Sequence, residues 1–166
     1  MSSKRIFGMV LLIGLFLSCK KSDSVFGPGL DNALIGTWQR AESIPSGRSA
    51  ADFRYFVMES TFRFGKDATY SYTLDFYGFE DENPNEIIGS SERIGTFEVK
   101  GDRIFFRDIE TTSWENGFNP TPQTKALNGQ VYENRFEIAE NVLTLHYISY
   151  PADAPVQTQM SYKRVE

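Results

Sequence analysis

Apolar and polar residues alternate with a period of two over most of the chain after residue 34. Between Phe56 and Phe64, apolar side chains occupy nearly every second position, and polar residues such as Glu59 and Arg63 stand between them. The segment Tyr70–Phe76 repeats this alternation after the turn residues Gly65-Lys66-Asp67. Successive side chains of a strand point to opposite faces, so each segment predicts a β-strand with one apolar face. The short turn between them predicts a hairpin.

The rest of the chain continues with turns at short intervals and without a stretch of helical period. Six further strands are predicted, at Gly36–Ala41, Ile94–Lys100, Arg103–Ile109, Val131–Ile138, Val142–Ser149 and Thr158–Val165. About eight strands in an unbroken meander are enough to close a small barrel, and closure removes the sheet edges that favour aggregation. The sequence therefore predicts an all-β fold, an eight-stranded antiparallel up-and-down barrel. A β-sandwich is the alternative, because it needs similar strands with connections that cross between two sheets.

Three connections are too long for simple turns and are predicted to be loops: Glu42–Arg54, Tyr77–Glu92 and Glu110–Asn128. The first is expected to hold a short helix near Ala50-Ala51. Long loops in a compact domain are often functional, so these three are natural places to look for contacts with other molecules.

The first eighteen residues have the order of a bacterial export signal. Lys4 and Arg5 give a positive start, and Ile6–Leu17 is an almost uncharged apolar run that is short for a membrane span. Cys19, the only cysteine of the chain, follows directly. Phe16-Leu17-Ser18-Cys19 resembles a bacterial lipobox, in which a peptidase cleaves before a cysteine that carries lipid. The predicted organisation is a signal peptide at 1–18, a lipidated cysteine and flexible linker at 19–33, and a barrel domain at 34–166.

An ordinary signal peptide with an incidental cysteine is the alternative to lipidation at Cys19. A lone free thiol is a liability in an exported protein, and its place at this junction favours lipidation. The prediction is therefore a protein tethered to the bacterial outer membrane through lipid on Cys19, on the periplasmic or the outer surface. In the linker, Asp23-Ser24-Val25 resembles the O-glycosylation sequon of Bacteroidota lipoproteins, which makes Ser24 a candidate glycosylation site.

The barrel sequence carries a short motif at each end. Gly36-Thr37-Trp38 lies on the first predicted strand, and Arg164 lies on the last. Together with the strand order, they resemble the lipocalin-like domains of bacterial lipoproteins, within the calycin group of barrels, over Leu34–Val165. The resemblance implies that the Arg164 guanidinium packs over Trp38 and closes the barrel floor. A planar cation on an indole face is worth about 0.5–2 kcal/mol, and glycine at position 36 allows close approach.

The resemblance also implies that a small apolar molecule binds inside the barrel. The side chains that alternation turns inward are Phe56, Met58, Phe62, Tyr70, Tyr72, Leu74, Phe97, Phe106, Tyr132, Phe136, Leu145, Tyr147, Met160 and Tyr162. An eight-stranded barrel is just wide enough for such side chains to fill it. The large number of aromatic residues favours a filled or narrow interior over a wide cavity.

Charge and composition narrow the chemistry. The net charge of -5, without a basic stripe, argues against a nucleic-acid partner. The one histidine, His146, is predicted to point outward, and the chain has no serine-nucleophile, phosphate-loop or zinc-binding motif. The acidic run Glu80-Asp81-Glu82 lacks the ligand spacing of a calcium loop, so no metal is expected. We therefore expect neither enzymatic activity nor a cofactor.

Trp114 and Phe118 lie among Asn, Gly and Pro residues in the predicted loop Glu110–Asn128. Exposed aromatic residues anchor many interfaces, so these two are candidates for contact with a protein partner. The alternative is that the loop folds over one end of the barrel and buries both residues as a lid.

Two functions remain open from the sequence. The first is a membrane-anchored lipoprotein of the cell envelope that binds a small apolar ligand through the barrel mouth and the loops. The second is a non-catalytic accessory subunit of an outer-membrane or envelope complex, with a filled barrel that serves as a scaffold. An open, lined cavity would favour the first, and a packed interior with an apolar loop patch would favour the second.

Overall fold

The structure is a computed structural model that describes residues 32–46 and 54–165 of the 166-residue chain. This part of the chain is built almost entirely of antiparallel β-strands. They are β1 (Gly36–Ser46), β2 (Arg54–Phe64), β3 (Thr69–Phe79), β4 (Ile87–Lys100), β5 (Arg103–Glu115), β6 (Asn119–Ala126), β7 (Val131–Ala139), β8 (Val142–Ser149) and β9 (Val156–Arg164). A short 3-10 turn, η1 (Pro151–Asp153), joins β8 to β9.

Eight of these strands form a closed ring. The order of hydrogen-bonded neighbours is β4-β3-β2-β1-β9-β8-β7-β5, and the pairing of β4 with β5 closes the barrel. β6 pairs with β5 alone and stands outside the ring. The predicted fold, an eight-stranded antiparallel up-and-down barrel, is confirmed.

Several strands extend into segments that were predicted to be loops, and those predictions are wrong. β1 continues to Ser46, β4 begins at Ile87, and β5 continues to Glu115. β6 occupies much of the third predicted loop, and all of its residues after Asn119 are exposed. Apolar and polar residues alternate along a strand only when one of its faces is buried. A strand that is exposed on both faces therefore has no such pattern and is not detected from the sequence. The helix expected near Ala50-Ala51 lies outside the described residues.

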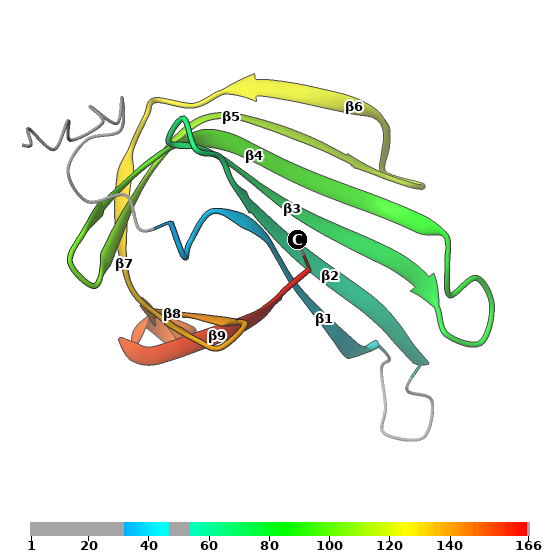
Figure 1. Ribbon diagram of the computed structural model, residues 1–166. Helices are drawn as coiled ribbons and strands as arrows, with labels where there is room; N and C mark the ends of the chain where they lie inside the picture. Colours follow the sequence, from blue (N-terminus) through cyan, green and yellow to red (C-terminus); the bar gives the residue numbers. More distant parts are fainter. Residues whose placement is uncertain (1–31, 47–53, 166) are drawn as a thin grey trace, which may run out of the picture.

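The two ends of the barrel differ. β1 pairs with β9 at only two positions, Trp38 with Arg164 and Gln39 with Lys163, and the rest of β1 pairs with β2 alone. In the same way, β6 extends β5 without a partner on its other side. One end is therefore a complete ring, whereas at the other end β1–β6 continue as a curved sheet beyond β7–β9 (Figure 1).

Aromatic side chains fill the closed end. The fully buried Phe106 ring lies near the centre, with ring centroids at 5.8 Å from Phe62, 4.9 Å from Tyr70 and 5.2 Å from Tyr132. Leu143 is also fully buried in this cluster. Burial of each large apolar side chain contributes about 1.5–3 kcal/mol, so this cluster is the main source of stability.

Candidate functional site

The open end of the barrel carries a cavity of about 340 Å³ on its inner face. This space, called the rim cavity below, lies in the size range of small-molecule sites. Residues of the five strands β1 to β5 line it. Most of the lining side chains are apolar, among them Phe56, Phe76, Phe79 and Ile88, and Ser46 and Glu115 lie at its margins.

The strand register explains why aromatic rings meet at this point. Phe76 follows Tyr72 at even positions along β3, and therefore shares the inner face with the core. The pairing of β2 with β3 shifts beyond Met58, which brings Phe79 opposite Phe56. The Phe56 ring centroid lies 6.4 Å from those of both Phe76 and Phe79. A β-bulge bends the strand it occupies, so this shift turns the end of β3 and its aromatic residues toward the cavity.

A glycine leaves the cavity open. Gly89 pairs with Phe76 across β3 and β4, and it is buried without a side chain of its own. A methyl group added there would lie 3.3 Å from the Trp114 carbonyl oxygen and 3.5 Å from Glu115 Cγ. A larger side chain at position 89 would therefore occupy the space above the Phe76 ring, where a ligand could bind.

The acidic run is attached to the wall of the rim cavity. The Arg54 guanidinium lies 3.9 Å from the Phe79 ring centroid, and Arg54 Nη2 lies 2.8 Å from Asp81 Oδ1 and 2.9 Å from Glu82 Oε1. The hydrogen bond from Arg54 lowers the pKa of Asp81. Within residues 32–46 and 54–165, no group of three or more His, Cys, Asp or Glu side chains could hold a metal ion.

A polar cluster lies deeper in the barrel, where Tyr70 on β3 and Asp108 on β5 both pair with Gly95 on β4. The Tyr70 hydroxyl donates to Asp108, which is 9% exposed, and lies 3.2 Å from the Tyr132 hydroxyl. Arg93 Nη1 lies 3.6 Å from Asp108 Oδ2. Burial raises the pKa of the Tyr70 and Tyr132 hydroxyls, which therefore keep their protons further into the alkaline range than an exposed tyrosine. These groups satisfy one another, so the cluster is part of the packed interior.

Most of the residues predicted to line a cavity belong to the packed interior instead. Seven of them are buried in the core: Phe62, Tyr70, Phe97, Phe106, Phe136, Leu145 and Tyr162. Tyr72, Tyr132 and Met160 pack against that core while partly buried. The remaining half-buried members are Met58, Leu74 and Tyr147. Phe56 is the one member of the predicted set that lines the rim cavity.

Sequence reasoning missed the other walls of the rim cavity. Phe76 continues the alternation of β3 and could have been included by extending the pattern one step. Phe79 and Ile88 lie in the segment predicted to be a loop, where the register shift of β3 and the turn before β4 obscure the period.

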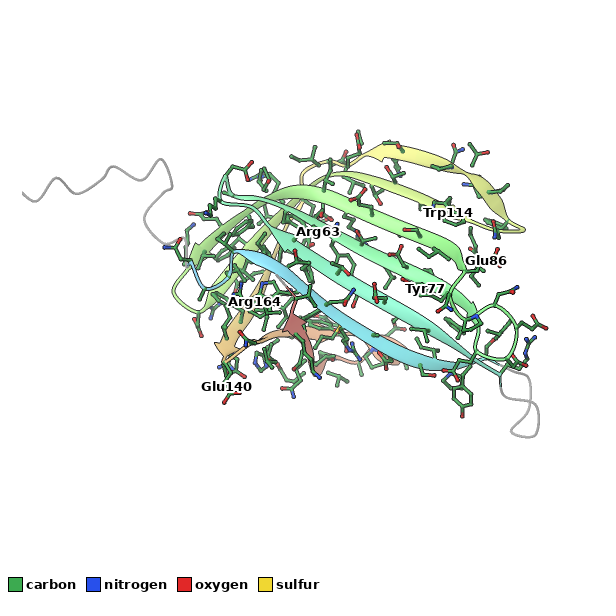
Figure 2. The ribbon with its side chains drawn as sticks, turned by 45° about the vertical axis from the view of Figure 1, so that its right-hand side comes forward. Arg63, Tyr77, Glu86, Trp114, Glu140 and Arg164 are labelled. Atoms are coloured by element: carbon green, nitrogen blue, oxygen red, sulfur yellow. The ribbon has the colours of Figure 1, made fainter. Side chains whose placement is uncertain are left out.

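The predicted floor residues lie together at the closed end, opposite the rim cavity. The Arg164 Cζ atom lies 4.1 Å from the Trp38 ring centroid, and Arg164 Nη1 donates to the Ile35 carbonyl at 2.8 Å. Trp38 is fully buried, and its Nε1 donates to the Leu34 carbonyl at 2.8 Å. Gly36 has a positive φ of 133°, which only glycine adopts without strain. Figure 2 shows Arg164 at this end and Trp114 toward the free end of the long sheet.

The two residues proposed for partner contact are not on a long loop. Trp114 is half-buried on β5, where it pairs with Ser90. Phe118 lies in the turn between β5 and β6 and is 87% exposed, so the lid that would bury both residues is wrong. His146 Nε2 lies 3.4 Å from Glu137 Oε1 on the barrel surface.

Comparisons with protein-family models, with curated proteins and with solved structures find no significant match for this chain. In the parts of the chain that the structure describes, no helix has the length and apolar character needed to cross a membrane. Cys19 and Ser24, the predicted lipidation and glycosylation sites, lie outside the described residues.

Proposed function

We propose that this protein is a lipid-anchored, lipocalin-like binding protein of the bacterial outer membrane that holds a small apolar ligand in the rim cavity. The observation that supports ligand binding is the contrast between the two ends of the barrel. Aromatic rings fill the closed end, whereas at the open end Phe56, Phe76 and Phe79 line about 340 Å³ of space. Anchoring rests on the export signal and Cys19, and the lipocalin-like class rests on the Gly36-Thr37-Trp38 and Arg164 motif.

The energetics favour an apolar occupant. Covering apolar surface contributes about 25 cal/mol for each Å² removed from water, and aromatic walls provide such surface. Most of the described residues that line the rim cavity are apolar, and neither histidine nor cysteine is among them. We therefore propose binding without catalysis.

The test is a variant that fills the cavity. Ser46 lies at the end of β1 and lines the rim cavity, so Ser46→Trp places an indole in the ligand's space. We expect the affinity for an apolar fluorescent probe such as 1-aminoanthracene to fall at least about tenfold, which corresponds to about 1.4 kcal/mol. Ala41→Trp is the matched control, because Ala41 is exposed on β1 and points to the other face. Probe binding that is absent from the parent protein, or unchanged in Ser46→Trp, would refute the proposal.

A scaffold for an envelope protein is the second proposal. The filled closed end and the 87% exposed ring of Phe118 favour this function. The same experiment distinguishes the two functions. If the protein is only a scaffold, Ser46→Trp should not change the affinity for the apolar probe.

A further inference from the structure

A second hollow of about 250 Å³ adjoins the rim cavity toward β6. Phe76 and Glu115 line both spaces, which therefore adjoin at these two residues. The second space, called the polar hollow below, also has Ser91, Ser113 and Asn119 in its lining. Its chemistry differs from that of the rim cavity because several hydroxyl groups and an amide stand beside its aromatic residues Phe76, Trp114 and Phe118.

The register arranges these side chains in rows across the inner face of the sheet. Phe76 pairs with Gly89, Gly89 with Glu115, and Glu115 with Asn119, which gives one row from β3 to β6. The next row contains Ser91 paired with Ser113. The first row becomes more polar from β3 toward β6, and the second row presents hydroxyl groups on β4 and β5. A ligand that covers both spaces therefore needs an apolar part over β2–β3 and a polar part over β4–β6.

Most polar side chains of the hollow have no partners within the described chain, and Ser90 is the exception among its lining residues. Ser91, Ser113 and Asn119 form no side-chain hydrogen bond with any described residue, and Glu115 forms no ion pair with one. By contrast, the neighbouring Ser90 hydroxyl donates to Asp75 at 2.6 Å. The hollow therefore offers donors and acceptors that a ligand can use.

The charges disfavour an anionic group. Among the described residues, Glu115 is the only ionisable side chain that lines either space. Two cations, Arg93 and Lys125, lie on the inner face in the next row of paired residues toward the closed end. Arg93 already forms an ion pair with Asp108, and Lys125 lines neither space. A carboxylate accepts hydrogen bonds from hydroxyl groups and repels anions.

We propose that the ligand is a neutral amphiphile, with its apolar part in the rim cavity and a hydroxyl-rich, sugar-like group in the polar hollow. Serine hydroxyls, an amide and a carboxylate match the donors and acceptors of a sugar, and the exposed Phe118 ring offers a flat apolar face to its C–H groups. This inference rests on the proposed function, because the apolar part occupies the site proposed there.

The test compares ligands that share one alkyl chain. Octyl glucoside, 1-octanol, octyl sulfate and octyltrimethylammonium are titrated by calorimetry into the protein, each below its micelle concentration or, for octanol, below its solubility limit. We expect the glucoside to bind about tenfold more tightly than octanol and more tightly than either charged compound, since hydrogen bonds contribute about 1 kcal/mol each. Stronger binding of the sulfate or the ammonium compound would overturn the proposed head group.

Variants separate this inference from the proposed function. In the double variant Ser91→Ala, Ser113→Ala, the glucoside should lose about tenfold in affinity while octanol is unaffected. Thr112→Ala is the matched control, because Thr112 neighbours Ser113 on β5, faces outward and bonds Thr124. If octanol binds and the glucoside binds no better, the sugar-like group is refuted while the rim cavity stands. If neither binds, both proposals fail.

Discussion

A cation on an indole ring closes the barrel where the two ends of the described chain meet. Because Trp38 is fully buried, Trp38→Ala should lower the free energy of unfolding by about 3–5 kcal/mol. Arg164→Ala loses the stacking contact and the 2.8 Å bond to Ile35, and should cost roughly 2–4 kcal/mol. Urea denaturation followed by circular dichroism measures both. Lys163→Ala is the control, since Lys163 is exposed on the same strand and should change stability by less than about 0.5 kcal/mol. Parent-like unfolding of both variants would show that the pair is not structural.

The buried hydroxyl of Tyr162 makes stability depend on alkaline pH. Burial raises its pKa above the ordinary value of about 10, so the folded protein keeps the proton after the unfolded chain has lost it. The unfolded state then binds fewer protons, and the free energy of unfolding falls as pH rises above about 10, by about 1.4 kcal/mol per pH unit for this group. Tyr162→Phe should remove that share of the slope and change little at neutral pH, because the hydroxyl's bonding partner is the Met160 sulfur at 3.6 Å.

Urea titrations between about pH 9 and about pH 11 measure this slope. Tyr150→Phe is the control, because the Tyr150 side chain is 65% exposed. Equal slopes for the parent and Tyr162→Phe would contradict the assignment of the alkaline loss to the buried hydroxyl.

At the scale of elements, two prolines protect the free edge of β6 against pairing with a strand of another molecule. β6 pairs with β5 alone, and Pro120 and Pro122 occupy alternate positions near its start. Proline has no N–H group to donate to an incoming strand, and for this reason it is common on edge strands. Replacing both with threonine should restore these donors and favour association between copies through β6. Size-exclusion chromatography with light scattering should then show concentration-dependent dimers, whereas Thr121→Ser, on the same strand, should stay like the parent. A monomeric double variant would show that the prolines do not protect this edge.

The strands also show what the sequence could and could not predict. Strands with one buried face, such as β2 and β8, have a clear period of two, and their pairing into an eight-stranded barrel followed from their number and spacing. β6 and the first residues of β4 lie on the extended part of the sheet, where β6 is exposed on both faces and the start of β4 is mostly half-buried, so the period disappears. The site is on this extension, and one of the fourteen predicted cavity residues, Phe56, lines it. Register shifts such as the one beyond Met58 depend on pairing between strands, which no local pattern encodes.

At the scale of the whole molecule, the barrel changes from a packed ring to an open sheet along its length. The closed end holds the first described residues and Arg164, and the rim cavity lies at the other end. The same inner face thus supplies stability at one end and ligand-accessible surface at the other. Stability and binding should therefore respond to different substitutions, with Trp38 affecting mainly the first and Ser46 mainly the second.

The predicted lipid on Cys19 is expected to anchor the whole molecule in a membrane. Cys19 is the only cysteine, so metabolic labelling with a palmitate analogue should label the parent in its bacterial host and leave Cys19→Ala unlabelled. Each buried methylene contributes about 0.8 kcal/mol, so the lipidated parent should sediment with membranes. A chain in which a cysteine-free, cleavable export signal replaces residues 1–19 should appear in the soluble fraction. Ser22→Ala, in the linker, is the control that should keep both label and membrane association. Label retained by Cys19→Ala, or sedimentation of the cysteine-free chain with membranes, would show that lipid on this residue is not the anchor.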